Sequence, residues 1–224
     1  MLRNRLSLVI VAGMLSAAGA AAQDSHDLAP YLMTDRAAEV ALARTAAPKN
    51  ISDSATVLAL TKTGYVEAAH GTNGFTCMVQ RSFFAPIADP NFWFPANRSP
   101  ICINPPATRT LLPEIMKRAE WIMSGVSPGE ILKRTDEAYA SHKFPMPAPG
   151  AMSYMLSPDQ VLAPTNPHWV PHLMFYYAKS MAGATWGLDD GNGAMIDAPG
   201  DPDYPIRLVL IPVRRWSDGK MAMP

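Results

Sequence analysis

Six short runs along the chain, some alternating between apolar and polar residues and others almost continuously apolar, are predicted to form β-strands. The first three runs are joined by short turns and are predicted to form an antiparallel meander. In the third, Cys77 and Val79 share one face, while Thr76 and Met78 share the other. The last run is apolar at nearly every position, as expected of a central strand. The predicted strands cover residues 56–61, 65–70, 75–83, 150–156, 168–178 and 206–213.

Helical spacing of apolar residues predicts three helices. The third helix follows the second closely and opens with a capping box at residues 127–130. Residues 23–33, ahead of the first helix, are expected to be a loose arm. The predicted helices cover residues 36–45, 108–124 and 127–142, the second starting at either Thr108 or Leu112.

The order of these elements predicts the fold class. Strands come first, a helix pair follows, and further strands complete the chain. Alternating βαβ units are missing, so a doubly wound parallel sheet is not expected. The sequence therefore predicts an α+β fold, with a mainly antiparallel sheet of about five to six strands and a helix pair inserted between two strand groups.

Residues 1–22 have the composition of a signal peptide. Arg3 and Arg5 precede an apolar run at residues 6–15, and alanines occupy residues 20–22. The apolar run is too short to span about 30 Å of hydrocarbon. Cleavage is therefore predicted before Gln23. This leaves residues 23–224 as a single globular domain that is periplasmic or secreted and has no membrane span.

The charge balance does not indicate nucleic acid as a partner. The chain has 19 basic and 19 acidic residues, and loss of Arg3 and Arg5 with the leader leaves 17 against 19, a net charge of −2. Proteins that bind nucleic acid or anionic membranes usually carry a basic surface. The expected partner is therefore a small ligand or an envelope protein.

Cys77 and Cys102 are the only cysteines of the chain. In an exported protein an even cysteine count predicts a disulfide, and no C-x-x-C redox motif is present. The bridge would close a loop of 26 residues, counted from Cys77 to Cys102. Loop-closure entropy assigns about 3.5 kcal/mol to this closure. A metal site or a catalytic thiol would need the pair reduced.

Two histidines lie close together in the segment H-W-V-P-H at residues 168–172. On a helix, His168 and His172 would lie side by side and could chelate one metal ion, but Pro171 disfavours a helix there. On a strand they would stand about 13 Å apart, too far for one ion. A metal site would need a bend at Pro171 or remote ligands. No H-E-x-x-H or H-x-H motif occurs, so no metal or other cofactor is indicated.

Ser153 lies in A-M-S-Y-M, which is not the G-x-S-x-G elbow of serine hydrolases. A hydrolase using Ser153, either His168 or His172, and an acid such as Asp159 or Asp189 is chemically sound. Spacing along the chain neither supports nor excludes it. The leading hypothesis is a domain that binds a ligand or partner without catalysis. The alternative is a hydrolase or metal-dependent enzyme centred on His168, His172 and Ser153.

The loop between the cysteines contains three consecutive aromatic residues, Phe92, Trp93 and Phe94. Alternating geometry cannot bury all three rings on one face. In the strand predicted at residues 168–178, one face carries His172 and Tyr176 among apolar side chains, a mixture typical of a pocket wall. We expect the loop to cover this face and to form a ligand cleft with Trp93, His172 and Tyr176. Alternatively, the three rings cap the core.

Four motifs distinguish the chain: G-T-N-G-F-T-C at 71–77, P-G-A-M-S-Y-M at 149–155, H-W-V-P-H-L-M-F at 168–175 and W-S-D-G at 216–219. Together they resemble a group of uncharacterised exported proteins from bacterial genomes. The resemblance covers most of residues 23–224. It implies a bacterial, exported, single-domain protein and carries no activity, cofactor or site residue across.

Overall fold

The computed structural model describes residues 26–165, 168–181, 195–198, 200–202 and 204–222. The predicted signal peptide, residues 1–22, therefore lies outside the described residues. Within the described ranges the chain forms one mixed sheet of eight strands and five α-helices. The α+β class and the mainly antiparallel sheet are confirmed, and the sheet is larger than the predicted five to six strands.

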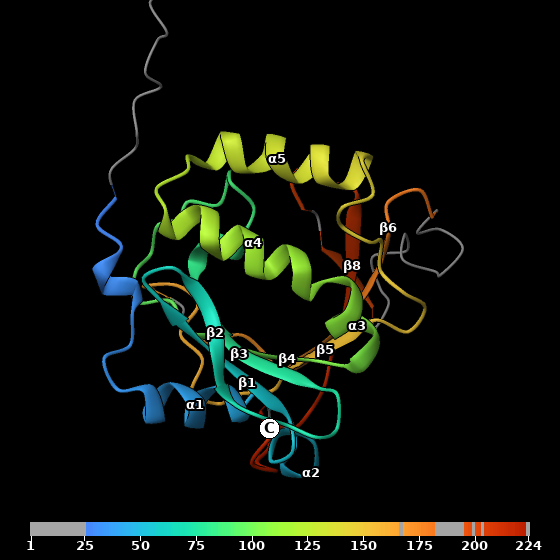
Figure 1. Cartoon of the computed structure of the whole chain (residues 1–224). Coiled ribbons are helices and arrows are strands. Elements are labelled where there is room, and N and C mark those ends of the chain that lie inside the picture. Colours follow the sequence, from blue (N-terminus) through green and yellow to red (C-terminus); the bar gives the residue numbers. More distant parts are fainter. Residues whose placement is uncertain (1–25, 166–167, 182–194, 199, 203, 223–224) are drawn as a thin grey trace, which may run out of the picture.

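Figure 1 labels the helices and strands in chain order. The strands are β1 (Thr56–Thr61), β2 (Gly64–Ala69), β3 (Thr76–Gln80), β4 (Ser99–Ile103), β5 (Met152–Met155), β6 (His172–Ala178), β7 (Ile196–Ala198) and β8 (Ile206–Pro212). The α-helices are α1 (Arg36–Arg44), α2 (Lys49–Ser52), α3 (Pro105–Thr110), α4 (Leu112–Met123) and α5 (Pro128–Ala140). Two short 3₁₀ turns are η1 (Ala29–Tyr31) and η2 (Ser82–Phe84).

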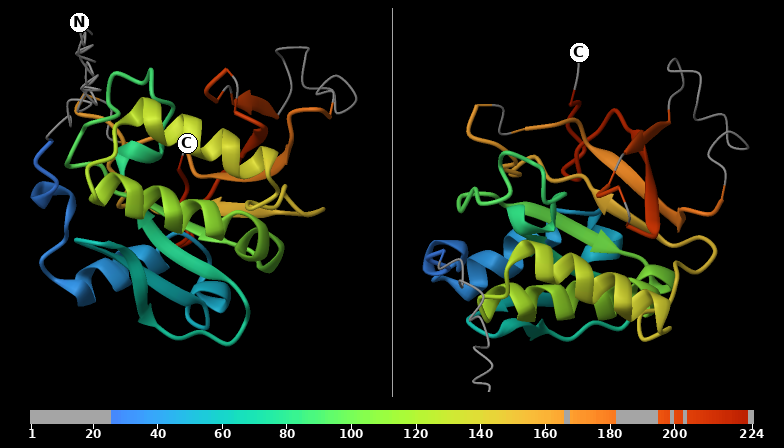
Figure 2. Two further views of the ribbon diagram at one scale, coloured as in Figure 1. Left: turned by 45° about the horizontal axis from the view of Figure 1, so that its top comes forward. Right: turned by 90° about the horizontal axis from the view of Figure 1, so that it is seen from above.

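The strands are ordered β2-β1-β3-β4-β5-β6-β8-β7. All neighbours are antiparallel except β1 and β3, which run parallel. In Figure 2 the C-terminal strands, orange to red, form one end of the twisted sheet, and the N-terminal strands form the other. The predicted helix pair is confirmed, because α4 and α5 lie in sequence between β4 and β5.

The predicted meander is wrong, because β3 does not pair with β2. Strand β2 ends beside the start of β1, where Val57 pairs with Ala69. The chain then passes close to that start and enters β3 on the far side of β1. A Cβ at Gly71 would lie 2.0 Å from the backbone nitrogen of Thr56, so only glycine permits this approach. Turn residues in the sequence predict a reversal but do not say on which side the next strand pairs.

The sequence pattern did not predict two of the strands, β4 and β7. Strand β4 contains Pro100 and follows a proline-rich loop, a composition that disfavours a strand prediction. Strand β7 has only three residues and pairs along β8. Both depend on pairing with a distant neighbour more than on a local pattern. Strand β6 also begins at His172 and not at 168, so His168 precedes the strand.

The two faces of the sheet are covered by different helices (Figure 1). Leu58, Leu60 and Met78 belong to the larger core, to which residues of α4 and α5 also contribute. Val57 and Val79 belong to a second core, which includes Ala43 of α1. The predicted alternation in β3 is therefore confirmed. Because strand side chains point alternately to opposite sides, the same strands contribute residues to both cores.

The predicted disulfide is present between Cys77 and Cys102. The two residues are paired directly across β3 and β4, and both are fully buried in the core beneath α1. The bridge thus joins neighbouring strands as well as closing the aromatic loop. Among the described residues no helix is long and apolar enough to cross a membrane.

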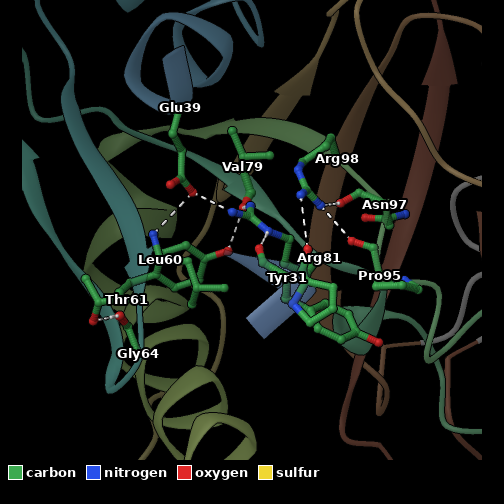
Figure 3. A network of polar contacts seen from close by, with 12 residues as sticks. Tyr31, Glu39, Leu60, Thr61, Gly64, Val79, Arg81, Pro95, Asn97 and Arg98 are labelled. Carbon is green, nitrogen blue, oxygen red and sulfur yellow. Dashed lines mark hydrogen bonds and ion pairs between the residues drawn. The ribbon is translucent and has the colours of Figure 1, made fainter. Parts of the chain in front are cut away.

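Helix α1 is joined to the sheet by a buried ion pair (Figure 3). Arg81 Nη2 lies 2.6 Å from Glu39 Oε1, and the two side chains are 0% and 1% exposed. The same carboxylate oxygen accepts a hydrogen bond from the backbone N–H of Leu60. Arg81 also donates to the carbonyls of Tyr31 and Val79. The expected loose arm is wrong for residues around Tyr31, because that side chain is only 2% exposed.

Candidate functional site

A cavity of about 300 Å³ lies between α4 and strands β5, β6 and β8. We call it the α4 pocket. Its wall is mainly apolar and includes Phe84, Leu111, Ile115, Met155, Met174 and Ile206. Strand alternation places Met155, Met174 and Ile206 on the helix-covered face, where all three belong to the larger core. Pockets that bind small molecules start at about this volume and are lined in this way.

Glu114 is the acidic group at the centre of the polar contacts of the α4 pocket. It lies in the first turn of α4 and is buried, with 5% of its surface exposed. Its Oε2 accepts hydrogen bonds from the hydroxyl of Tyr139, at 2.7 Å, and from the hydroxyl of Tyr204. Burial and the nearby Glu114 charge raise the pKa of both phenols. Both therefore remain protonated and act as donors to the carboxylate.

Arg118 lies one helical turn after Glu114 and also lines the pocket. Its guanidinium carbon is 5.9 Å from the centre of the Phe84 ring, and its Nη2 donates to the carbonyl of Ala85 at 3.1 Å. Its Nε is buried and has no hydrogen-bond partner among the described residues. A buried donor without a partner costs roughly 1–3 kcal/mol. Arg118 is therefore held in place while part of its hydrogen-bonding capacity stays unused.

Tyr176 is the only residue of the predicted cleft that lines the α4 pocket. Its hydroxyl lies 2.9 Å from the hydroxyl of Ser153, and burial raises the pKa of Tyr176 to about 12. Ser153 is fully buried and does not line the pocket. The structure therefore pairs the candidate nucleophile with a phenol. No hydrogen bond joins Ser153 to His168 or His172 among the described residues.

His172 is buried at the start of β6, with 3% of its surface exposed. Its Nδ1 lies 2.8 Å from the carbonyl of Val170, and its ring lies 4.6 Å from that of Trp169. His168 lies outside the strand, four residues earlier. Among the described residues no group of three or more His, Cys, Asp and Glu side chains could hold a metal ion.

Burial lowers the pKa of His172 below its ordinary value of 6.5. The hydrogen bond to the Val170 carbonyl raises this pKa, but by less than burial lowers it. The unfolded chain therefore binds a proton more readily than the folded protein. We expect this site to lower stability as the pH falls below about 6.5. Urea unfolding between pH 7.5 and pH 5 should show a smaller loss of stability for His172→Gln than for the wild type. His70→Gln replaces an exposed histidine in the same way and is the control. Equal slopes for His172→Gln and the wild type would contradict the expectation.

Trp93 lies in a different hollow, of about 290 Å³. Its ring stacks on His26 at 4.0 Å and meets Phe92 edge-on at 4.9 Å. Leu28 and residues 122–128, which run from the end of α4 to the start of α5, form the rest of this hollow. Of the three consecutive aromatic residues, Phe92 is buried, while Trp93 and Phe94 are partly exposed. The expectation that they cannot all be buried on one face agrees with this. Neither of these two pockets contains Trp93, His172 and Tyr176 together.

Glu114 and Arg118 line the α4 pocket, and neither was predicted from the sequence as a candidate site residue. A usable signal was present, because both residues lie on the buried face of α4 with Ala119 and Ile122. A charged side chain on the apolar face of a helix is rarely buried without a partner. Tyr204 had no comparable signal, since it lies in a loop rich in proline and aspartate.

Comparisons with protein-family models, curated proteins and solved structures found no match to this chain, so the α4 pocket has to be interpreted from its own geometry.

Proposed function

We propose that the protein binds a small, largely apolar ligand in the α4 pocket and does so without catalysis. The observation that carries this proposal is a pocket of about 300 Å³ with a mainly apolar wall and polar groups at Glu114, Arg118, Tyr176 and Tyr204. Small-molecule sites combine apolar walls with a few convergent polar groups in this way. An apolar cavity of about 150 Å³ accepts benzene, so this pocket has room for a two-ring body.

The arrangement of the polar groups favours binding over catalysis. Nucleophilic catalysis needs a nucleophile within hydrogen-bond reach of a base. Among the described residues that line the pocket there is no serine, cysteine or histidine. Burial and the Glu114 charge raise the pKa of Tyr204, so that phenol stays protonated and is a poor nucleophile. The Glu114 carboxylate instead accepts two phenol hydrogen bonds, an arrangement that fixes it in place. The pocket therefore resembles a rigid receptor more than a reaction centre.

We also propose that the protein works outside the cytoplasm, in the periplasm or as a secreted protein. The support is the buried bridge between Cys77 and Cys102, because disulfides persist in oxidising compartments. Thiol trapping in a bacterial host should find both cysteines oxidised. Recovery of both as free thiols from intact cells would contradict this proposal.

Binding can be tested with a neutral fluorescent probe, naphthalene-2-methanol. We expect saturable binding of one probe per chain. Ile115→Trp places a larger side chain in the pocket wall and should weaken binding at least tenfold, because the added ring occupies the cavity. The matched control is Met146→Trp, at an exposed position that does not line the pocket. It should bind as the wild type does.

Circular dichroism and thermal melting of all three proteins establish that each is folded before titration. Two results would overturn the proposal. One is the absence of saturable binding by the folded wild type up to the solubility of the probe. The other is equal affinity in the wild type and in Ile115→Trp, which would place the probe elsewhere on the protein.

A further inference from the structure

We infer that the ligand of the α4 pocket carries an acidic group of the carboxylate class, and that Arg118 recognises it. This inference rests on the proposed function, because it assigns the chemistry of a ligand in the same pocket. Of the polar groups that line the pocket, Arg118 has a buried nitrogen, Nε, without a hydrogen-bond partner among the described residues.

The missing partner is a hydrogen-bond acceptor. Arg118 is 6% exposed, yet its Nε has no partner among the described residues. A guanidinium has five N–H donors, and among the described residues Arg118 makes one hydrogen bond, from Nη2 to the carbonyl of Ala85. Most buried polar side-chain atoms in proteins do have a partner, so an exception of this kind points to a group that is bound in function.

The acidic groups of the pocket already have donors. Glu114 accepts from Tyr139 and Tyr204, and Asp201 accepts from the backbone N–H of Ile87 at 2.9 Å. Neither carboxylate bridges to Arg118, since no ion pair joins them among the described residues. The polar group of the pocket that lacks a partner is therefore a donor, the Nε–H of Arg118. A ligand that supplies a hydrogen-bond acceptor would satisfy it.

Arg207 also lines the pocket but is a weaker candidate for the same role. It lies in β8 between Ile206 and Leu208, both of which pack against the core beneath the helices. Because strand side chains alternate, the Arg207 side chain points to the opposite face. Arg118 is thus the cation that the fold directs toward the cavity.

An acid is a better partner for Arg118 than a neutral carbonyl. A carboxylate can form two parallel hydrogen bonds with a guanidinium and also neutralises its charge, whereas a neutral carbonyl leaves the buried cation without a counter-charge. The Phe84 ring and the Ala85 carbonyl hold the guanidinium in place, so little side-chain entropy is lost when a ligand binds. The apolar wall would surround the rest of the molecule.

The test compares three probes with the same two-ring body: naphthalene-2-carboxylate, naphthalene-2-methanol and naphthalene-2-methylamine. Isothermal titration of the wild type at pH 7.5 should give at least tenfold tighter binding of the carboxylate than of the alcohol. Arg118→Met should remove this preference while the alcohol still binds. Arg134→Met, at a half-exposed arginine of α5 outside the pocket, is the control and should keep the preference.

The outcomes separate this inference from the proposed function. If the carboxylate and the alcohol bind the wild type equally well, the acid inference is overturned and the pocket stands. If the amine binds best, the pocket recognises a cation through Glu114, which also overturns it. If no probe binds the folded wild type, the proposed function itself fails. The wild-type comparison needs no variant, so it decides the question even if Arg118→Met does not fold.

Discussion

Replacing Arg81 with methionine is expected to lower the free energy of unfolding by about 3–5 kcal/mol, the usual cost of removing one partner of a buried ion pair. The reason is that Glu39 would remain as a charge that is 1% exposed and has lost its cation. The carbonyls of Tyr31 and Val79 would also lose their guanidinium donor. For a chain of this size the melting temperature should fall by about 6–20 °C. Urea unfolding and calorimetry measure both quantities.

The double variant Glu39→Leu/Arg81→Met distinguishes an uncompensated charge from lost packing. It removes both charges, so it should be more stable than Arg81→Met alone. Lys49→Met supplies the surface comparison, because its ion pair with Asp53 is formed by exposed side chains, and it should change stability by no more than about 0.5 kcal/mol. A loss below about 1 kcal/mol in Arg81→Met would show that the buried pair does not hold α1 on the sheet.

Reduction of the Cys77–Cys102 bridge is expected to lower the free energy of unfolding by about 3.5 kcal/mol. The two cysteines are 25 positions apart, so the reduced unfolded chain gains the freedom of a long loop. Because both sulfurs are buried, the folded protein should resist reductant until it unfolds. Urea unfolding with and without dithiothreitol compares proteins that differ only in the bridge.

The double variant Cys77→Ala/Cys102→Ala separates the crosslink from packing. Both side chains belong to the core beneath α1, so the variant should be less stable than the reduced wild type by the cost of the added cavity. If oxidised and reduced wild type unfold at the same urea concentration, the bridge contributes no stability and the loop-entropy argument does not apply.

Local features of the fold could be predicted because they depend on neighbours in the sequence. The alternation in β3 was enough to place Cys77 and Met78 on opposite faces. The start of α5 followed from Ser127, whose hydroxyl accepts from the backbone N–H of Glu130. The disulfide followed from an even cysteine count in a chain predicted to be exported.

The pairing of distant segments could not be predicted. A strand pattern does not say which neighbour the strand will have, so β3 was expected beside β2 and lies beside β1. Glu39 and Arg81 are 42 positions apart, and their ion pair exists only because α1 packs across the sheet. No local propensity distinguishes these partners from other charged residues of the chain.

The sequence by itself determined the class of the fold, most of its helices and strands, and the covalent bridge. These follow from side-chain periodicity and capping, which act within a few residues. Only the tertiary structure decided the α4 pocket. Glu114, Tyr139 and Tyr204 come from two helices and a loop, and 90 positions separate the first from the last. Such a site forms where residues of the helix pair and of β5, β6 and β8 meet in the larger core, because burial of the apolar faces brings these polar groups together.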